Sequence, residues 1–93
     1  MEDVLWHLLA SSRGGPSRIR LLRAIDDRPR NANQLAEAVD LDYTTVRHHL
    51  ARLEENNVVR SSGDGYGAVY RWTDLAEANR ETVREIVATV DPE

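Results

Sequence analysis

Apolar side chains recur every three to four residues in five stretches of the chain, which is the spacing of amphipathic helices. A glycine pair at 14–15 separates the first two stretches. Asn31, with Gln34 three residues later, has the pattern of a capping box, and Asp42 and Thr73 are candidate caps for the helices that follow them. The pattern predicts helices over about residues 3–11, 16–27, 32–39, 43–56 and 74–90.

Between the last two predicted helices the pattern changes to two short runs that are typical of strands. Residues 58–61 and 68–72 form these runs, and the glycine-rich segment 63–67 between them predicts a hairpin tip. Tyr70 and Trp72 share one face of the second strand and are expected to face the core. The predicted fold class is mostly α with a small β-hairpin, in the order α-α-α-α-β-β-α. This order is that of a winged helix-turn-helix.

Residues 32–56 meet the physical requirements of a helix-turn-helix, with the hairpin at 58–72 as its wing. Ala36 is small enough for two helix backbones to approach each other, and Asp40 is placed at the turn, where a left-handed residue is often needed. Asn57 can close the second helix in the same conformation. The angle between the helices would be held by apolar side chains at Leu41, Val46, Leu50 and Leu53.

The run NQLAEAVDLDYTTVRHHLARLEENNVV at residues 33–59 resembles the ArsR-type winged-helix regulators. The resemblance extends over about residues 17–76 and is most specific at VRHHLARLEENNV and at the YRWT that follows the wing. It implies a homodimer that binds operator DNA and regulates transcription. Asp40 replaces the usual glycine at the turn. The chain has no cysteine and its last helix has no histidine, so metal sensing is not implied and no cofactor is expected.

The predicted recognition helix, 43–56, turns a polar face outward if its apolar residues face the core. Arg47 on this face can pair with guanine, and Thr44 and Thr45 can bond a base or a phosphate. Ordinary solvated positions are the alternative for all of them, and Tyr43 could equally pack against the preceding helix. Arg60 or Arg71 of the wing would lie along the minor groove or the backbone. The candidate DNA-binding residues are Tyr43, Thr44, Thr45, Arg47, His48, Arg52, Tyr66 and Arg71.

Further basic side chains lie outside the recognition helix. Arg18, Arg20 and Arg23 are expected to lie largely on the outward face of the helix over 16–27. Arg18, Arg28 and Arg30 are candidate phosphate clamps, with a solvated face as the equal alternative for each. His49 is expected to be a half-buried structural residue, hydrogen-bonded to backbone. The three histidines are scattered and have no metal-ligand spacing.

One recognition helix reads too few base pairs to discriminate a site by itself. Two copies spaced by one helical turn would read a near-palindromic operator. The first and last helices, at about 3–11 and 74–90, carry apolar stripes for such pairing, although these stripes could instead only close the core of one protomer. The candidate interface residues are Val4, Leu5, Leu8, Val83, Ile86, Val87 and Val90.

Charge is unevenly distributed along this 93-residue chain, whose formal net charge is −4. Residues 13–30 hold six arginines against two aspartates, about +4, whereas residues 74–93 hold six acids against two arginines, about −4. All twelve basic residues are arginines, the residue type suited to phosphate and guanine. A lysine-free, acidic composition is typical of halophilic archaea, although a GC-rich genome has the same effect.

The sequence lacks the motifs of the common enzyme classes, such as a phosphate loop, a nucleophile elbow or a clustered acid–base set. We therefore expect a non-enzymatic protein of one domain, 1–93, without a membrane segment and in the cytoplasm. The negative net charge favours an alternative function, that of a protein-interaction module in a multiprotein transcription assembly. RNA binding is a third possibility. The sequence does not indicate a small-molecule effector.

Overall fold

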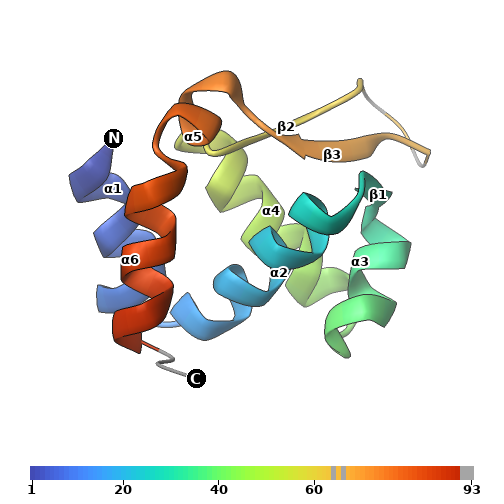
Figure 1. Ribbon diagram of the computed structural model, residues 1–93. Coiled ribbons are helices and arrows are strands. Elements are labelled where there is room, and N and C mark those ends of the chain that lie inside the picture. Colours follow the sequence, from blue (N-terminus) through green and yellow to red (C-terminus); the bar gives the residue numbers. More distant parts are fainter. Residues whose placement is uncertain (64, 66, 91–93) are drawn as a thin grey trace.

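The computed structural model describes residues 1–63, 65 and 67–90, and it is mainly helical with a small antiparallel sheet (Figure 1). The helices between residues 15 and 55 form the centre of the molecule, and the helices near the two ends of the chain lie beside them. The elements in chain order are α1 (Glu2–Trp6), η1 (His7–Ser11), α2 (Gly15–Asp27), β1 (Arg30–Asn31), α3 (Ala32–Val39), α4 (Tyr43–Glu55), β2 (Val59–Ser61), β3 (Val69–Trp72), α5 (Asp74–Ala78) and α6 (Arg80–Val90).

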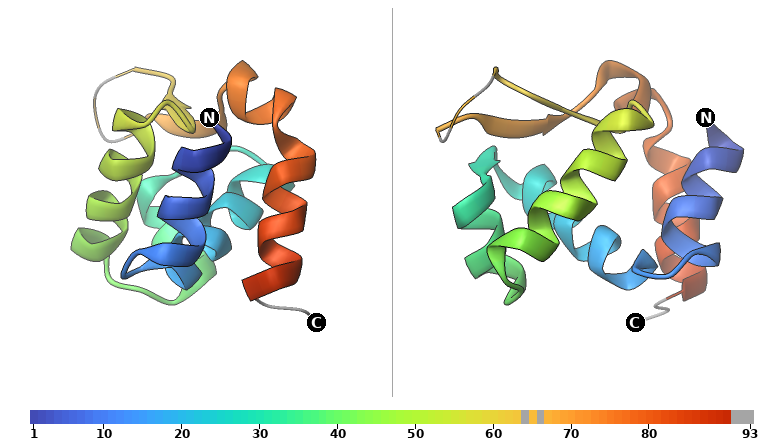
Figure 2. Two further views of the ribbon diagram at one scale, coloured as in Figure 1. Left: turned by 90° about the vertical axis from the view of Figure 1, so that its left-hand side faces the viewer. Right: turned by 180° about the vertical axis from the view of Figure 1, so that it is seen from behind.

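The core lies where the apolar faces of the helices meet. α1 and η1 run beside α6 in every view, and α4 crosses in front of α2 when the molecule is seen from behind (Figure 2). The buried positions follow the helical periodicity of the sequence, so the amphipathic pattern accounts for the packing. The residues buried most completely include Leu5, Leu9, Leu21, Leu35, Val46, Leu50, Leu53 and Ile86.

The sheet has the strand order β1-β3-β2 with antiparallel neighbours. Val59 lies opposite Trp72, and Arg60 lies opposite Arg71. Tyr70 is buried and Trp72 is half-buried against the core, as the alternation of the second strand predicted. β1 was not predicted, because two residues are too few to show a period and their partners, Tyr70 and Val69, lie 40 and 38 positions later in the chain.

The predicted caps and turns are confirmed. Asn31 and Gln34 form the reciprocal bonds of a capping box before α3. Asp42 accepts a hydrogen bond from the Thr45 backbone N–H at the start of α4. Asp40, with φ of 57°, closes α3 in the left-handed conformation, and Asn57, with φ of 61°, follows α4 in the same conformation. Thr73 caps α5 through the backbone N–H of Ala76.

Two predicted helices are not uniform. The first ends as the π-helical segment η1, where the Leu8 carbonyl accepts a hydrogen bond from the side chain of Arg18. The predicted helix 74–90 is divided at Asn79, whose side chain donates to the Leu75 carbonyl and whose backbone leaves the helical region. Asparagine competes with the helical backbone for hydrogen bonds in this way. Leu75 is exposed on the short helix α5.

Candidate nucleic-acid interface

α4 is held against the core by one face and presents the opposite face to solvent. Val46, His49, Leu50 and Leu53 recur at helical spacing and are buried, as the periodicity of an amphipathic helix requires. The opposite face exposes Thr44, Arg47, His48 and Ala51. The predicted outward positions Thr44, Arg47 and His48 are outward in the structure, whereas Arg52, also predicted outward, is half-buried. α4 is the second helix of a helix-turn-helix with α3.

The remaining candidate residues differ in exposure. Thr45 and Arg52 are half-buried, and Tyr43 is half-buried with its side chain packed against the core. Arg71 is exposed on β3, opposite Arg60 of β2. Tyr66 lies outside the described residues.

Four of the candidates meet in one groove on the outer side of α4. The groove has a volume of about 630 Å³ and lies between α4 and the loop that joins η1 to α2. Arg47 and Arg71 do not line it. Its lining residues are Arg13, Gly14, Arg18, Thr44, Thr45, His48, His49 and Arg52.

Arg18 forms the floor of this groove and is only 2% exposed. Its Nε donates to the Leu8 carbonyl at 2.8 Å, and one terminal nitrogen donates to the Arg13 carbonyl at 2.8 Å and to the Ser12 hydroxyl. The other terminal nitrogen lies 3.2 Å from Nδ1 of His49. Because a guanidinium can only donate hydrogen bonds, Nδ1 of His49 accepts and is unprotonated.

We expected Arg18 to lie on the outward face of α2 and to clamp phosphate, and this expectation is wrong. Arg18 stands four residues before Leu22 and seven before Ile25, so it belongs to the buried face of α2. Among the described residues its buried charge has no carboxylate partner, but four hydrogen bonds use four of the five N–H donors of the guanidinium. Burial, and then the charge of Arg52, lower the pKa of Arg18.

His49 is buried beside Arg18, so its predicted structural role is confirmed, although its partner is a side chain and not the backbone. Burial lowers the pKa of His49, and the charges of Arg18 and His48 lower it further. The contact is close: a Cβ added to Gly14 would lie 2.7 Å from Cε1 of His49 and 2.9 Å from the Arg18 guanidinium. Gly14 also has φ of +87°, so both space and conformation favour glycine there.

The other basic residues of this region are placed unequally. Arg30 donates to the Ala24 carbonyl and to Asp27 at 3.1 Å, so it holds the C-terminal end of α2 and is not a free phosphate clamp. Arg20 is exposed but donates to the Val39 carbonyl at the end of α3. Arg28 is exposed and remains a candidate clamp.

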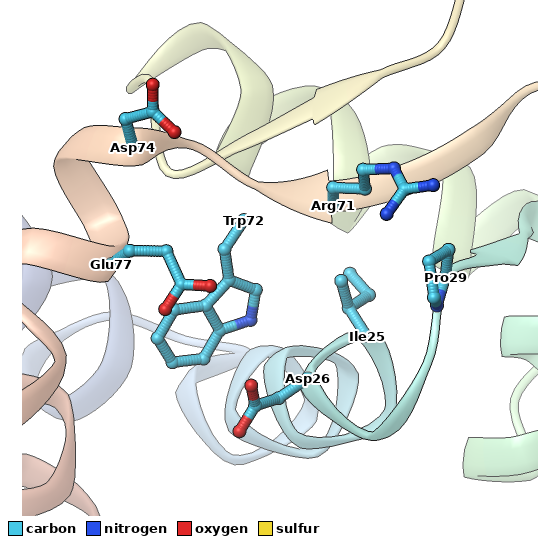
Figure 3. A pocket seen from close by; sticks show the side chains of 7 residues that line it. All are labelled: Ile25, Asp26, Pro29, Arg71, Trp72, Asp74 and Glu77. Atoms are coloured by element: carbon cyan, nitrogen blue, oxygen red, sulfur yellow. The ribbon is translucent and has the colours of Figure 1, made fainter.

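A second pocket lies between the end of α2 and the β3–α5 connection (Figure 3). Beside it, the Arg80 guanidinium lies 4.5 Å from the centre of the Trp72 ring and donates to Asp26 at 2.8 and 2.9 Å, as well as to Glu77. These bonds lower the pKa of Asp26. The indole N–H of Trp72 donates to the Leu22 carbonyl at 3.0 Å. This pocket therefore adjoins a set of contacts that joins α2, β3 and α6.

The candidate interface residues of the first and last helices fall into two groups. Leu5, Leu8, Val83 and Ile86 are buried within the protomer itself. The exposed or half-exposed group consists of Val4, Val87 and Val90. Only this second group presents surface to a second copy in the structure of one chain.

Sequence reasoning did not assign Arg13 to a site, although it lines the groove. Its position directly before the glycine pair at 14–15, which is a turn signal, was the one local feature that set it apart in the sequence. Among the described residues, no three His, Asp or Glu side chains gather as metal ligands would. Within the same part of the chain, no helix is long and apolar enough to cross a bilayer.

Known proteins match this chain over most of its length. Residues 15–61 match the model of the family described as "Bacterial regulatory protein, arsR family". The HTH-type transcriptional regulator KmtR of Mycobacterium tuberculosis is 34% identical over 71 residues, which are 76% of this chain and 50% of KmtR. The chain thus spans about half the length of the curated relative it matches.

Solved structures agree on the fold. The transcriptional repressor CouR, bound to a 23-mer DNA duplex, superimposes with a TM-score of 0.73 at 19% identity, covering 97% of this chain and 66% of CouR. A homodimeric winged helix-turn-helix DNA-binding domain of Mycobacterium bovis gives a TM-score of 0.67 at 20% identity, covering 94% and 72%. These likenesses confirm the winged helix-turn-helix fold.

The family and its structural neighbours are regulatory proteins and not enzymes, as the sequence led us to expect. The family match covers the helix-turn-helix and the first strand of the wing, and it includes six of the eight residues that line the groove. The chain therefore belongs to the arsR family of bacterial regulatory proteins.

Proposed function

We propose that this protein is a homodimeric transcription regulator that reads double-stranded DNA by placing α4 in the major groove. The observation that carries this proposal is the outer face of α4. Its first two turns expose Thr44, Arg47 and His48, whereas the acidic residues of the helix, Glu54 and Glu55, come at its far end. A helix of this kind enters the major groove with its N-terminal residues toward the bases.

The side chains of α4 divide the work of recognition. Arg47 is exposed and suits bidentate pairing with guanine, and it is the residue on which sequence reading depends most. Thr44, Thr45 and His48 contact bases or adjacent phosphates, and Arg52 contacts the sugar-phosphate backbone of the DNA. Tyr43, at the start of the helix, contacts the DNA backbone through its hydroxyl. Arg71 and Tyr66 belong to the wing contact.

Dimerisation follows from the need for discrimination. One recognition helix reads only a few base pairs, and a two-fold pair reads a near-palindromic operator. We place α1, η1 and α6 at the two-fold axis, with Val4, Val87 and Val90 as the surface contributed by each copy. Residues 1–93 then form one domain, with the helix-turn-helix at 32–56 and the wing at 58–72. The M. bovis domain, of the same fold, is described as homodimeric.

The test is selection of bound sequences from a random duplex pool by the purified protein. It is carried out in moderate and in high salt, because the lysine-free acidic chain has the composition of a halophilic protein. We expect enrichment of a near-palindrome, and we expect Arg47→Ala to abolish the enrichment. Arg84→Ala, which removes an exposed arginine from α6, is the matched control and should leave the selected sequence unchanged, provided that size-exclusion chromatography shows the variant to be a dimer.

A protein-interaction module is the second candidate, and the net charge of −4 is the observation that favours it. The two functions are separated by the same selection. A protein that is folded and dimeric but enriches no sequence at either salt concentration contradicts the DNA-binding proposal and directs the search to protein partners.

A further inference from the structure

The groove beside α4 carries charge of one sign. Three of its lining residues, Arg13, Arg18 and Arg52, are arginines. The rest of the lining consists of Gly14, two threonines and two histidines, and the described residues that form it include no carboxylate. A concave surface with several cations and no counter-charge attracts anions.

Arg18, at the floor of the groove, uses four of its five N–H donors within the protein. Among these hydrogen bonds are one to the Arg13 carbonyl and one to the Ser12 hydroxyl. These bonds hold the backbone of the loop before α2. The Cα of Arg13 is therefore held in place opposite α4, and its side chain is exposed. Arg18 is therefore a positioning residue that also contributes positive potential.

The Arg52 guanidinium is incompletely hydrogen-bonded within the described part of the chain. Its Nε is buried and has no hydrogen-bond partner in the part of the chain that the structure describes. Its charge lies close enough to Arg18 to lower the pKa of that residue, so the two cations repel each other. An anion in the groove beside Arg13 and Arg52 would offset the repulsion between Arg52 and Arg18. It would accept hydrogen bonds from the guanidinium groups of Arg13 and Arg52.

We propose that this groove binds a phosphate-class anion, held by Arg13 and Arg52 and by the hydroxyls of Thr44 and Thr45. Where the source of the anion is a phosphate of the DNA backbone, the inference rests on the proposed function and adds Arg13 to the interface. A free phosphate or phosphate ester has the same chemistry and would occupy the same groove in competition with DNA. The experiment therefore has one arm for each source.

The first arm measures how DNA affinity depends on salt. The slope of log K against log salt changes by about 0.9 for each phosphate contact on duplex DNA. We expect Arg13→Gln and Arg52→Gln each to reduce the slope by about 1.8 for a dimer, with the same fold-loss on operator and on unrelated duplex. Arg84→Gln, the matched loss of one positive charge on α6, should leave the slope unchanged once size-exclusion chromatography has verified that this variant is still a dimer. Circular dichroism verifies that each variant is folded, and Arg13 is exposed, so its replacement does not disturb the core.

The second arm titrates inorganic phosphate into the free protein and follows the backbone amides of Thr44 and Thr45 by NMR. Shifts that saturate in the wild type and are lost in Arg13→Gln support the groove as a site for free anions, whether or not DNA binds. Unchanged salt slopes together with no phosphate-induced shifts overturn the inference. In that case normal sequence selection by the wild type leaves the proposed function standing, whereas phosphate binding without any DNA binding refutes the proposed function alone.

Discussion

Acidification should weaken this domain through one buried histidine. Nδ1 of His49 accepts a hydrogen bond from Arg18 at 3.2 Å, which is possible only while His49 is neutral. Protonation would remove this bond and place a second positive charge beside the buried guanidinium, with His48 adjacent on the same helix. The charged form of His49 is therefore disfavoured in the folded state.

The sign and size of the effect follow from proton linkage. The pKa of His49 lies below its ordinary value of 6.5 in the folded protein, so the unfolded chain binds the proton more readily. The free energy of unfolding is then unaffected well above pH 6.5 and falls as the pH drops below it. The loss is at most about 1.4 kcal/mol per pH unit, or up to about 2 kcal/mol between pH 6.5 and 5. The total stability of a small domain is about 5–15 kcal/mol.

Urea unfolding at a series of pH values and at one fixed protein concentration measures this effect. His49→Asn is the matched variant, because its amide oxygen can accept the bond from Arg18 and does not titrate. We expect the wild type to lose stability between pH 7 and 5 and the variant to lose much less. Asp26 does not confuse the result: its pKa is lowered by Arg80, so its contribution is lost only in more acidic solution.

The outcome that refutes this reasoning is an equal fall in stability for the wild type and for His49→Asn over that interval. The loss would then come from other groups, and the pairing of Arg18 with a neutral His49 would not determine how the domain responds to acid.

Three further predictions concern other contacts. Gly15→Ala would place a Cβ 2.4 Å from the Leu9 carbonyl, so we expect a loss of about 1–3 kcal/mol, measured by thermal unfolding; an unchanged melting temperature would show that the approach relaxes freely. Asp42→Ala removes the side-chain cap of α4 and should lower stability by about 1 kcal/mol, whereas Asp42→Asn should retain most of it. Arg80→Gln removes the partly exposed pair with Asp26, so the expected loss is below about 1 kcal/mol and smaller in 1 M salt; a salt-independent loss would contradict an electrostatic origin.

The sequence predicted the helix-turn-helix well because its determinants are local. Asn31 with Gln34, and Asp42, act on backbone groups within three residues of themselves. Asp40 takes the left-handed conformation at the end of α3 that the tight turn suggested. The outward face of α4 followed from the buried positions of the same helix.

The features that the sequence missed depend on contacts between distant segments. Arg18 is buried because a residue 31 positions later and the carbonyls of the preceding loop complete its hydrogen bonds, and a charge-based view of α2 placed it in solvent. β1 exists only because Tyr70 and Val69 pair with it. The division at Asn79 depends on a side chain that bonds the preceding turn, and helical periodicity alone did not show it. The groove could not be predicted from the sequence, because Arg18, which forms its floor, was expected to lie in solvent.

The contacts of Arg80 have a consequence for how the folded chain opens. Arg80 begins α6, yet it touches the end of α2 through Asp26 and the indole of β3 through Trp72, 54 and 8 positions away. The C-terminal helix is therefore not an appendage that frays by itself, because its release would uncover Trp72 and loosen α2 at the same time. Local unfolding of this kind is resisted wherever segments share contacts. In hydrogen exchange, the amides at the start of α6, next to Arg80, should thus open together with those at the end of α2.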